Sequence, residues 1–144
     1  MKVHIIYHTR YGNNELIVQD IMNALAAQGH QISTTSALSK GKDISGSDLY
    51  VFSCPIHGRK PARAMRKFIK RMEVKQEDHG EYACVITHAG APGNGLEKLE
   101  AALDLKGLTR KIPGISIKVK KPKGPLEEGY KLKANMVVKG VLQD

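Results

Sequence analysis

The sequence lacks the features that mark several large classes of protein. It has only two cysteines, Cys54 and Cys84, among 144 residues, which is too few for a disulfide framework or a zinc site. No apolar run approaches the ~20 residues that a membrane-spanning helix needs. The opening residues, MKVHIIYHTR, lead directly into a strand and lack the cleavage region of a signal peptide. We therefore expect a cytoplasmic protein with buried, reduced thiols, without a bound metal and without a membrane span.

The sequence does carry an excess of positive charge. It contains 23 Lys and Arg residues against 14 Asp and Glu residues, a net charge of +9. Two stretches concentrate this charge: Arg63, Arg66, Lys67, Lys70 and Arg71 recur at helical spacing, and Lys118, Lys120, Lys121 and Lys123 form a second run. Solvated faces are the simplest interpretation, and a docking surface for an acidic protein or a small acidic substrate is the alternative. No aromatic residues interleave with these charges, so we do not expect nucleic acid, whereas peripheral contact with an anionic membrane stays open.

Strand and helix patterns alternate from one end of the chain to the other. Apolar or extended stretches predict strands at residues 3–7, 30–35, 49–54, 81–88 and 114–119. Helical spacing predicts helices at about residues 13–28, 61–72 and 94–106, and a final, less regular helix in the tail that begins at Pro125. This alternation predicts one α/β domain, residues 1–144, with a parallel sheet between two layers of helices. Ligands of such sheets bind beyond the carboxyl ends of the strands, so the loops there are the candidate sites.

The first candidate loop, HTRYGNNE, contains groups suited to a phosphate. Thr9 and the amides of Asn13 and Asn14 can form hydrogen bonds, Gly12 permits a sharp turn, and Arg10 adds a positive charge. The following helix begins at Asn13 or Asn14, so its unpaired N–H groups point back into the loop and favour an anion. Helix capping by asparagine explains the same residues about equally well.

Two further loops follow the second and third confident strands. The second loop, PIHGR, consists of Pro55, Ile56, His57, Gly58 and Arg59 and leads into a helix that starts with proline. The third loop, THAGAPGNG, has three glycines and one proline, so it is a shaped loop whose backbone can approach a flat ligand closely. Ordinary strand-to-helix turns are the alternative for both.

Three other functions fit the sequence less well. GAPGNG has the spacing G-x-x-G-x-G, and no acid follows at the distance that a dinucleotide site requires. Cys54 and Arg59 are one residue too close for a cysteine phosphatase loop, and Pro55 removes one N–H donor. No aspartate cluster marks a phosphoacceptor domain.

The order and content of these loops resemble the flavodoxin-like family. The residues that fit its phosphate loop are Ile5, Ile6, Tyr7, Thr9, Gly12 and Asn13. Tyr11 and Asn14 stand where the family usually has threonine, although an asparagine amide can still donate to a phosphate. The stretch TRYGNN is also similar to the TRDGQT-type loop of flavodoxin-like protoporphyrinogen dehydrogenases. Ser-X-Pro-Ile with a following glycine resembles the family's flavin-facing second loop.

This resemblance implies a flavodoxin-like three-layer sandwich with five parallel strands in the order 2-1-3-4-5 and a bound FMN. It assigns the phosphate to Thr9, Arg10, Tyr11, Gly12, Asn13 and Asn14 and the flavin N5 edge to residues 55–59. The ring would be covered by His88, Ala89, Gly90, Ala91, Pro92, Gly93, Asn94 and Gly95. No tryptophan is present and the second and third loops lack Tyr and Phe, so we expect an accessible ring near Ile56, His57, His88 and Pro92.

The implied function is electron transfer, as a carrier with an acidic redox partner or as a small FMN-dependent oxidoreductase. The alternative is a flavin-free protein of the same fold that docks on an acidic partner through its basic helix.

Overall fold

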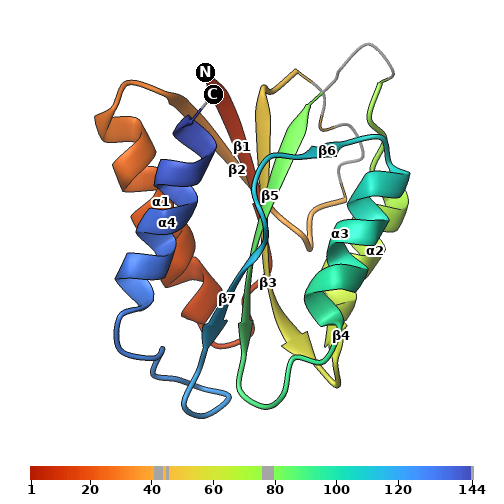
Figure 1. The fold of residues 1–144 in the computed structure, drawn as a ribbon. Helices are drawn as coiled ribbons and strands as arrows, with labels where there is room; N and C mark the ends of the chain where they lie inside the picture. Colours follow the sequence, from red (N-terminus) through yellow and green to blue (C-terminus); the bar gives the residue numbers. More distant parts are fainter. Residues whose placement is uncertain (41–43, 45, 76–79, 144) are drawn as a thin grey trace.

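The computed structural model describes residues 1–40, 44, 46–75 and 80–143, and these form a sheet between two pairs of helices (Figure 1). The strands are β1 (Lys2–Tyr7), β2 (Gln31–Ser36), β3 (Leu49–His57), β4 (Lys60–Pro61), β5 (Glu81–His88), β6 (Thr109–Arg110) and β7 (Ile115–Lys118). The helices are α1 (Asn13–Ala27), α2 (Arg63–Arg71), α3 (Gly95–Leu105) and α4 (Tyr130–Leu142). Helices α1 and α4 cover one face of the sheet, and α2 and α3 cover the other. Among the described residues, no helix combines the length and the apolar character that crossing a bilayer requires.

The order of the strands confirms the predicted fold class. The sheet runs β2-β1-β3-β5-β6, and its central pairs are parallel. The described residues form seven strands rather than the five predicted, and one of the two additional strands arises because two short strands share the last position of the sheet. Strand β6 pairs with the start of β5 and β7 pairs with its end, and Pro113, which has no N–H to donate, lies between them. The seventh strand is β4, which forms a short antiparallel hairpin with the end of β3.

Side chains of the central strands alternate between two apolar cores. Tyr50 and Phe52 of β3 face the core under α2 and α3, together with Phe68 of α2. Their neighbours Leu49 and Val51 face the core under α1 and α4. This two-residue period follows from strand geometry, and burial on both faces explains why β3 reads as a continuous apolar run. Cys54 of β3 and Cys84 of β5 are free of disulfides and buried, which confirms the expected buried thiols.

Two helix boundaries differ from the prediction. Pro61 belongs to β4 rather than to the helix, and α2 begins at Arg63 after the cap residue Ala62. The final helix begins only at Tyr130, because residues 119–126 form a loop closed by a bridge between Val119 and Leu126. We call residues 119–126 the fourth loop.

Replacing Gly80 by alanine should destabilise the fold. A Cβ at Gly80 would lie 2.5 Å from Cε2 of the buried Tyr50. Overpacking of this kind typically costs about 1–3 kcal/mol. We expect Gly80→Ala to lower the free energy of unfolding in urea titrations by an amount in that range. Gly90→Ala is the control, because a Cβ there meets nothing within 4 Å. Equal stability of both variants would contradict the packing at Tyr50.

Candidate functional site

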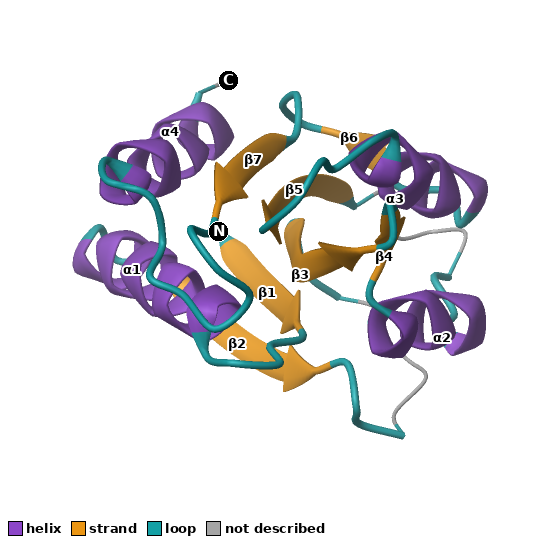
Figure 2. Cartoon of the chain, turned by 90° about the horizontal axis from the view of Figure 1, so that it is seen from below, coloured by secondary structure: helices purple, strands orange, loops and turns teal. Residues whose placement is uncertain are grey.

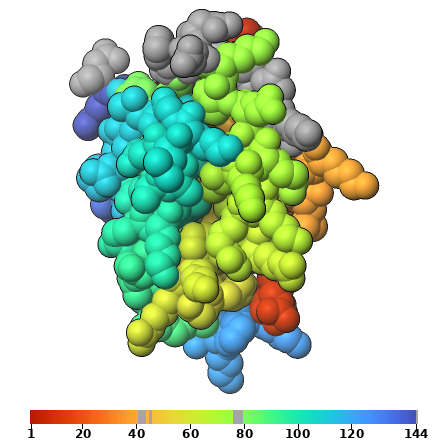
Figure 3. Space-filling view, turned by 90° about the vertical axis from the view of Figure 1, so that its right-hand side faces the viewer, coloured from red at the N-terminus to blue at the C-terminus, as the bar shows by residue number. Residues whose placement is uncertain are grey.

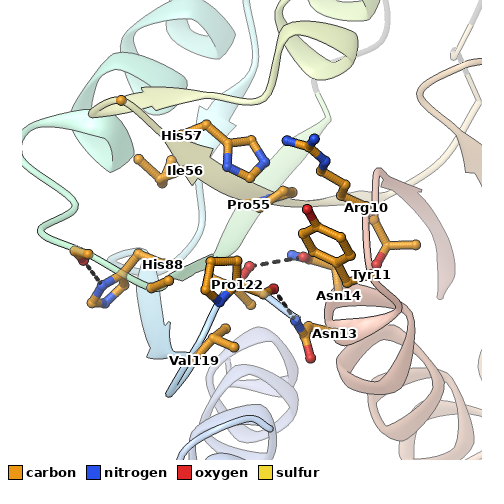
Figure 4. A pocket seen from close by; sticks show the side chains of 15 residues that line it. Arg10, Tyr11, Asn13, Asn14, Pro55, Ile56, His57, His88, Val119 and Pro122 are labelled. Atoms are coloured by element: carbon orange, nitrogen blue, oxygen red, sulfur yellow. Dashed lines mark hydrogen bonds between the residues drawn. The ribbon is translucent and has the colours of Figure 1, made fainter. Parts of the chain in front are cut away.

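The carboxyl ends of β1, β3, β5 and β7 meet at one edge of the sheet (Figure 2). The four loops that follow these strands surround a cavity of about 220 Å³ (Figure 4). The cavity is lined by Thr9, Arg10, Tyr11, Asn13, Asn14, Pro55, Ile56, His57, Gly58, Thr87, His88, Ala89, Gly90, Val119 and Pro122. The structure thus brings most of the predicted residues from three separate loops into one place. Val119 and Pro122 are additions that the sequence analysis did not identify, and Thr87 belongs to the predicted third loop but was given no role there.

Some predicted residues lie beside the cavity rather than in its lining. Gly12 lines a neighbouring, wider hollow of about 730 Å³. Arg59 and Ala91–Gly95 do not line the cavity; part of this segment instead packs the third loop against the second. A Cβ at Gly93 would lie 2.9 Å from the side chain of Arg59, and a Cβ at Gly95 would lie 2.8 Å from Ile56. These glycines therefore allow the two loops to approach each other closely.

The first loop ends in the start of helix α1. Gly12 has φ 91°, a left-handed conformation that suits glycine, and its N–H donates to Oγ1 of Thr9 at 2.8 Å. The helix begins at the next residue, Asn13, so the N–H groups of its first turn have no partner within the helix. Together with the positive end of the helix dipole, these groups form a place for an anion.

The side chain of Asn14 does not point to this place. It is 1% exposed, and its amide donates to Oγ of Ser53 at 3.1 Å and accepts from Oγ1 of Thr87 at 2.9 Å. One amide N–H and the amide oxygen of Asn14 are thus used within the protein, and donation from its second N–H to a phosphate stays a prediction. Asn14 instead ties the start of α1 to the central strands β3 and β5 beneath the cavity.

The fourth loop completes the wall of the cavity. The Asn13 side-chain amide donates to the carbonyl of Pro122 at 3.3 Å, and the N–H of Val119 donates to the carbonyl of His88 at 2.8 Å. Gly124, at φ 114°, lies so near the Oδ1 of Asn13 that a Cβ there would be 3.1 Å away. The signal in the sequence was the proline- and glycine-containing run KKPKGP directly after a predicted strand, since that strand also ends at this edge.

The electrostatic environment of the cavity is positive. No acidic side chain occurs among the described residues that line it. Burial and then the charge of Arg10 lower the pKa of His57, and burial and then the charge of His57 lower the pKa of His8. The guanidinium of Arg10 lies 5.3 Å from the ring centre of Tyr11, in a cation–π arrangement. The site therefore favours an anionic group.

His88 has a defined hydrogen-bonding direction. Its Nδ1 lies 2.8 Å from the carbonyl of Gly90, which can only accept, so Nδ1 carries the proton. In the neutral ring, Nε2 is then the hydrogen-bond acceptor.

The chemistry of the site agrees with a flat ligand that has an anionic tail. Pro55, Ile56, Val119 and Pro122 give the cavity apolar walls, while Arg10 and the start of α1 supply positive charge at one side (Figure 4). FMN has this combination of a flat ring and a dianionic phosphate, so the residues present fit it. The cavity is smaller than the roughly 300–1,000 Å³ of typical small-molecule sites, so it encloses only part of such a ligand.

Other chemistries find less support. Burial raises the pKa of the Cys54 thiol to about 12, which opposes the thiolate that a cysteine phosphatase requires. Within the part of the chain that the structure describes, no three His, Cys, Asp or Glu side chains gather as a metal site.

Comparisons with known proteins agree with the fold. A family model described as a flavodoxin domain matches residues 4–113. Flavodoxin 1 from Bacillus cereus superposes with a TM-score of 0.81 at 14% identity, covering 99% of this chain and 97% of that chain. The two-electron reduced flavodoxin of Megasphaera elsdenii gives 0.72 at 14% identity, with 96% and 97% covered. Rubredoxin:oxygen oxidoreductase from Desulfovibrio gigas gives 0.68 at 14% identity, covering 97% of this chain but 36% of that chain. No curated protein sequence matches.

Removing the amide of Asn14 should destabilise the protein more than its small size suggests. Asn14→Ala leaves the buried hydroxyls of Ser53 and Thr87 without this partner, and an unsatisfied buried group typically costs about 1–3 kcal/mol. We expect a loss of that size in urea unfolding. The triple variant Asn14→Ala, Ser53→Ala, Thr87→Val should lose less than the sum of the three single losses. Simple additivity would argue against a coupled network.

Lowered histidine pKa values should be visible by NMR in the cofactor-free protein. We expect His8 and His57 to titrate below the ordinary value of about 6.5, because burial and neighbouring positive charge oppose their protonation. The unfolded chain then binds protons more tightly at these sites, so the free energy of unfolding should fall as the pH drops below about 6.5. Arg10→Gln should raise the pKa of His57, and Arg63→Gln should leave it unchanged. If the pKa of His57 were unchanged in both variants, the charge of Arg10 would not act on His57, which would contradict the arrangement of the cavity.

Proposed function

Because the chain belongs to the flavodoxin domain family, whose cofactor is FMN, we propose that it is an electron-transfer flavoprotein that holds FMN in the cavity at the carboxyl edge of its sheet. The observation that carries this proposal is the position of the helix α1 start. Unpaired N–H groups, the Thr9 hydroxyl and the Arg10 guanidinium lie beside a cavity with apolar walls. A phosphate and a flat ring need these two environments side by side.

The proposed roles follow from the lining of the cavity. The main-chain N–H groups of the first helical turn bind the phosphate, with Thr9 and Arg10 beside them. The second loop, at Pro55–Gly58, and the third loop, at His88–Gly90, lie on either side of the ring. Pro122 of the fourth loop takes the place beside the ring that the sequence analysis gave to Pro92.

Bound FMN supplies the redox chemistry, because it can accept and release electrons, and the polypeptide positions it. Tyr11 lines the cavity and is 39% exposed, so its ring offers a stacking surface at the mouth. Burial and then the charge of Arg10 lower the pKa of His57, which favours its neutral form. Whether the protein acts as a carrier or turns over a small substrate depends on the partner that reaches the ring.

The cytoplasm is the proposed compartment. Two buried, unpaired cysteines are typical of a reducing environment, and no disulfide links them.

Binding of FMN and of riboflavin, which lacks the phosphate, tests the proposal. We expect FMN to bind and its fluorescence to be quenched. Arg10→Gln should weaken FMN binding by about tenfold, the equivalent of one charge-assisted hydrogen bond, and should change riboflavin binding by less than about twofold. Arg63→Gln on α2 is the matched control and should leave both affinities unchanged.

Two results would contradict the proposal. If Arg10→Gln lost equal affinity for FMN and for riboflavin, the phosphate would not bind at the first loop. A protein that binds neither ligand would favour the flavin-free alternative, in which the fold serves only to dock a partner.

A further inference from the structure

A second concave site lies on the opposite face of the molecule from α1 and α4. Helices α2 and α3 lie side by side there, with the turn of the β3–β4 hairpin below them (Figure 3). The groove between them has a volume of about 310 Å³ and is lined by Lys60, Pro61, Arg66, Ile69, Lys98, Leu99 and Ala102. It shares no residue with the cavity assigned to FMN.

The groove combines an apolar floor with a positive border. Ile69 and Leu99 form part of the floor, and Lys60, Arg66 and Lys98 are exposed around it. The ion pairs found among the described residues join Arg110 to Glu100, Lys111 to Glu81 and Lys133 to Glu127, so none of them uses a cation of the groove. The Nε of Arg66 donates to the carbonyl of Pro61 at 3.0 Å, which orients its guanidinium. Its remaining N–H groups are the donors for a carboxylate.

Helix α2 carries a charge arrangement that costs stability by itself. Its sequence, RAMRKFIKR, contains no acidic residue, and its first turn lacks the acid that would suit the positive end of the helix dipole. Arg63 lies three and four residues before Arg66 and Lys67, a spacing at which like charges repel. An acidic partner at this surface would relieve both costs.

The groove also lies close to the cavity. Lys60 at its border is the antiparallel pairing partner of His57, which lines the cavity. Paired residues in such a hairpin have Cα atoms about 5 Å apart. A partner seated in the groove therefore contacts one side of the hairpin whose other side lines the cavity.

We propose that the groove between α2 and α3 is the docking site for an acidic protein that exchanges electrons with the cofactor, an inference that rests on the proposed function. An apolar centre surrounded by charged residues is the arrangement that protein interfaces use. A nucleic acid would use the cations but not the apolar floor, and the lining contains no aromatic residue for base stacking. A flat membrane surface does not enter a concave groove.

An acidic [2Fe–2S] ferredoxin is a suitable probe, with a basic c-type cytochrome for comparison. At low ionic strength we expect the ferredoxin to bind the FMN-loaded and the FMN-free protein, and the association rate constant to fall with added salt. The amide shifts of the ¹⁵N-labelled protein should change around the groove and the β3–β4 turn. The cytochrome should associate more slowly, and its rate should rise with salt.

Charge-matched variants separate the groove from net charge. The groove triple variant, which combines Lys60→Gln, Arg66→Gln and Lys98→Gln, should reduce ferredoxin affinity by about tenfold or more. The control triple variant removes the same charge elsewhere, by Lys2→Gln together with Lys131→Gln and Lys139→Gln on α4. It should reduce ferredoxin affinity by less than about threefold. Ala102→Glu, which places a carboxylate in the groove, should also abolish tight binding. FMN titrations of every variant report whether the fold and the cavity are intact.

The outcomes distinguish this inference from the proposed function. If ferredoxin docks at the groove but FMN does not bind, the flavoprotein assignment and the electron exchange both fail, and only the docking of an acidic protein at the groove stands. If FMN binds and the control variant loses as much ferredoxin affinity as the groove variant, the inference is overturned. Amide shift changes centred on the fourth loop or α4 would also overturn the inference. So would duplex DNA that binds more tightly than ferredoxin at 150 mM salt and loses affinity in the groove variant.

Discussion

The site depends on the side chain of Asn14, which joins the start of helix α1 to the two central strands. Its amide bonds to Ser53 of β3 and Thr87 of β5 in a fully buried position, where an unmade hydrogen bond would be costly. This network fixes the direction in which the helix leaves the sheet. The N–H groups of the first turn therefore face the cavity. Because Ser53 and Thr87 lie just before the second and third loops, the same network also fixes the position of these two loops relative to the helix start.

Positive charge is distributed over this end of the molecule in two separate places. Arg10 and the helix start act inside the cavity, whereas Lys60, Arg66 and Lys98 act in the groove on the far side of the β3–β4 hairpin. The hairpin is thus a shared wall. The cofactor phosphate and the acidic partner that we propose would approach from different sides, so neither would neutralise the positive charge that attracts the other.

Much of the fold followed from local patterns. The strands 49–54 and 81–88 and the helix 13–28 have long, strongly periodic apolar patterns, and the structure contains all three. Strands β4 and β6 have two residues each, too few for any pattern, and exist only because a neighbouring strand pairs with them. The orientation of Asn14 could not be predicted for the same reason, since its partners lie 39 and 73 residues away. The position of Pro122 in the cavity lining could not be predicted either, because it depends on the conformation of the fourth loop.

The two thiols in the central strands make the protein convenient for site-specific labelling. Cys54 and Cys84 are 0% exposed, and burial raises the pKa of both, so neither offers the thiolate that alkylating reagents attack. The sequence contains no other cysteine. A single cysteine introduced on an outer helix face would therefore be the one position that a maleimide dye or spin label modifies while the chain stays folded.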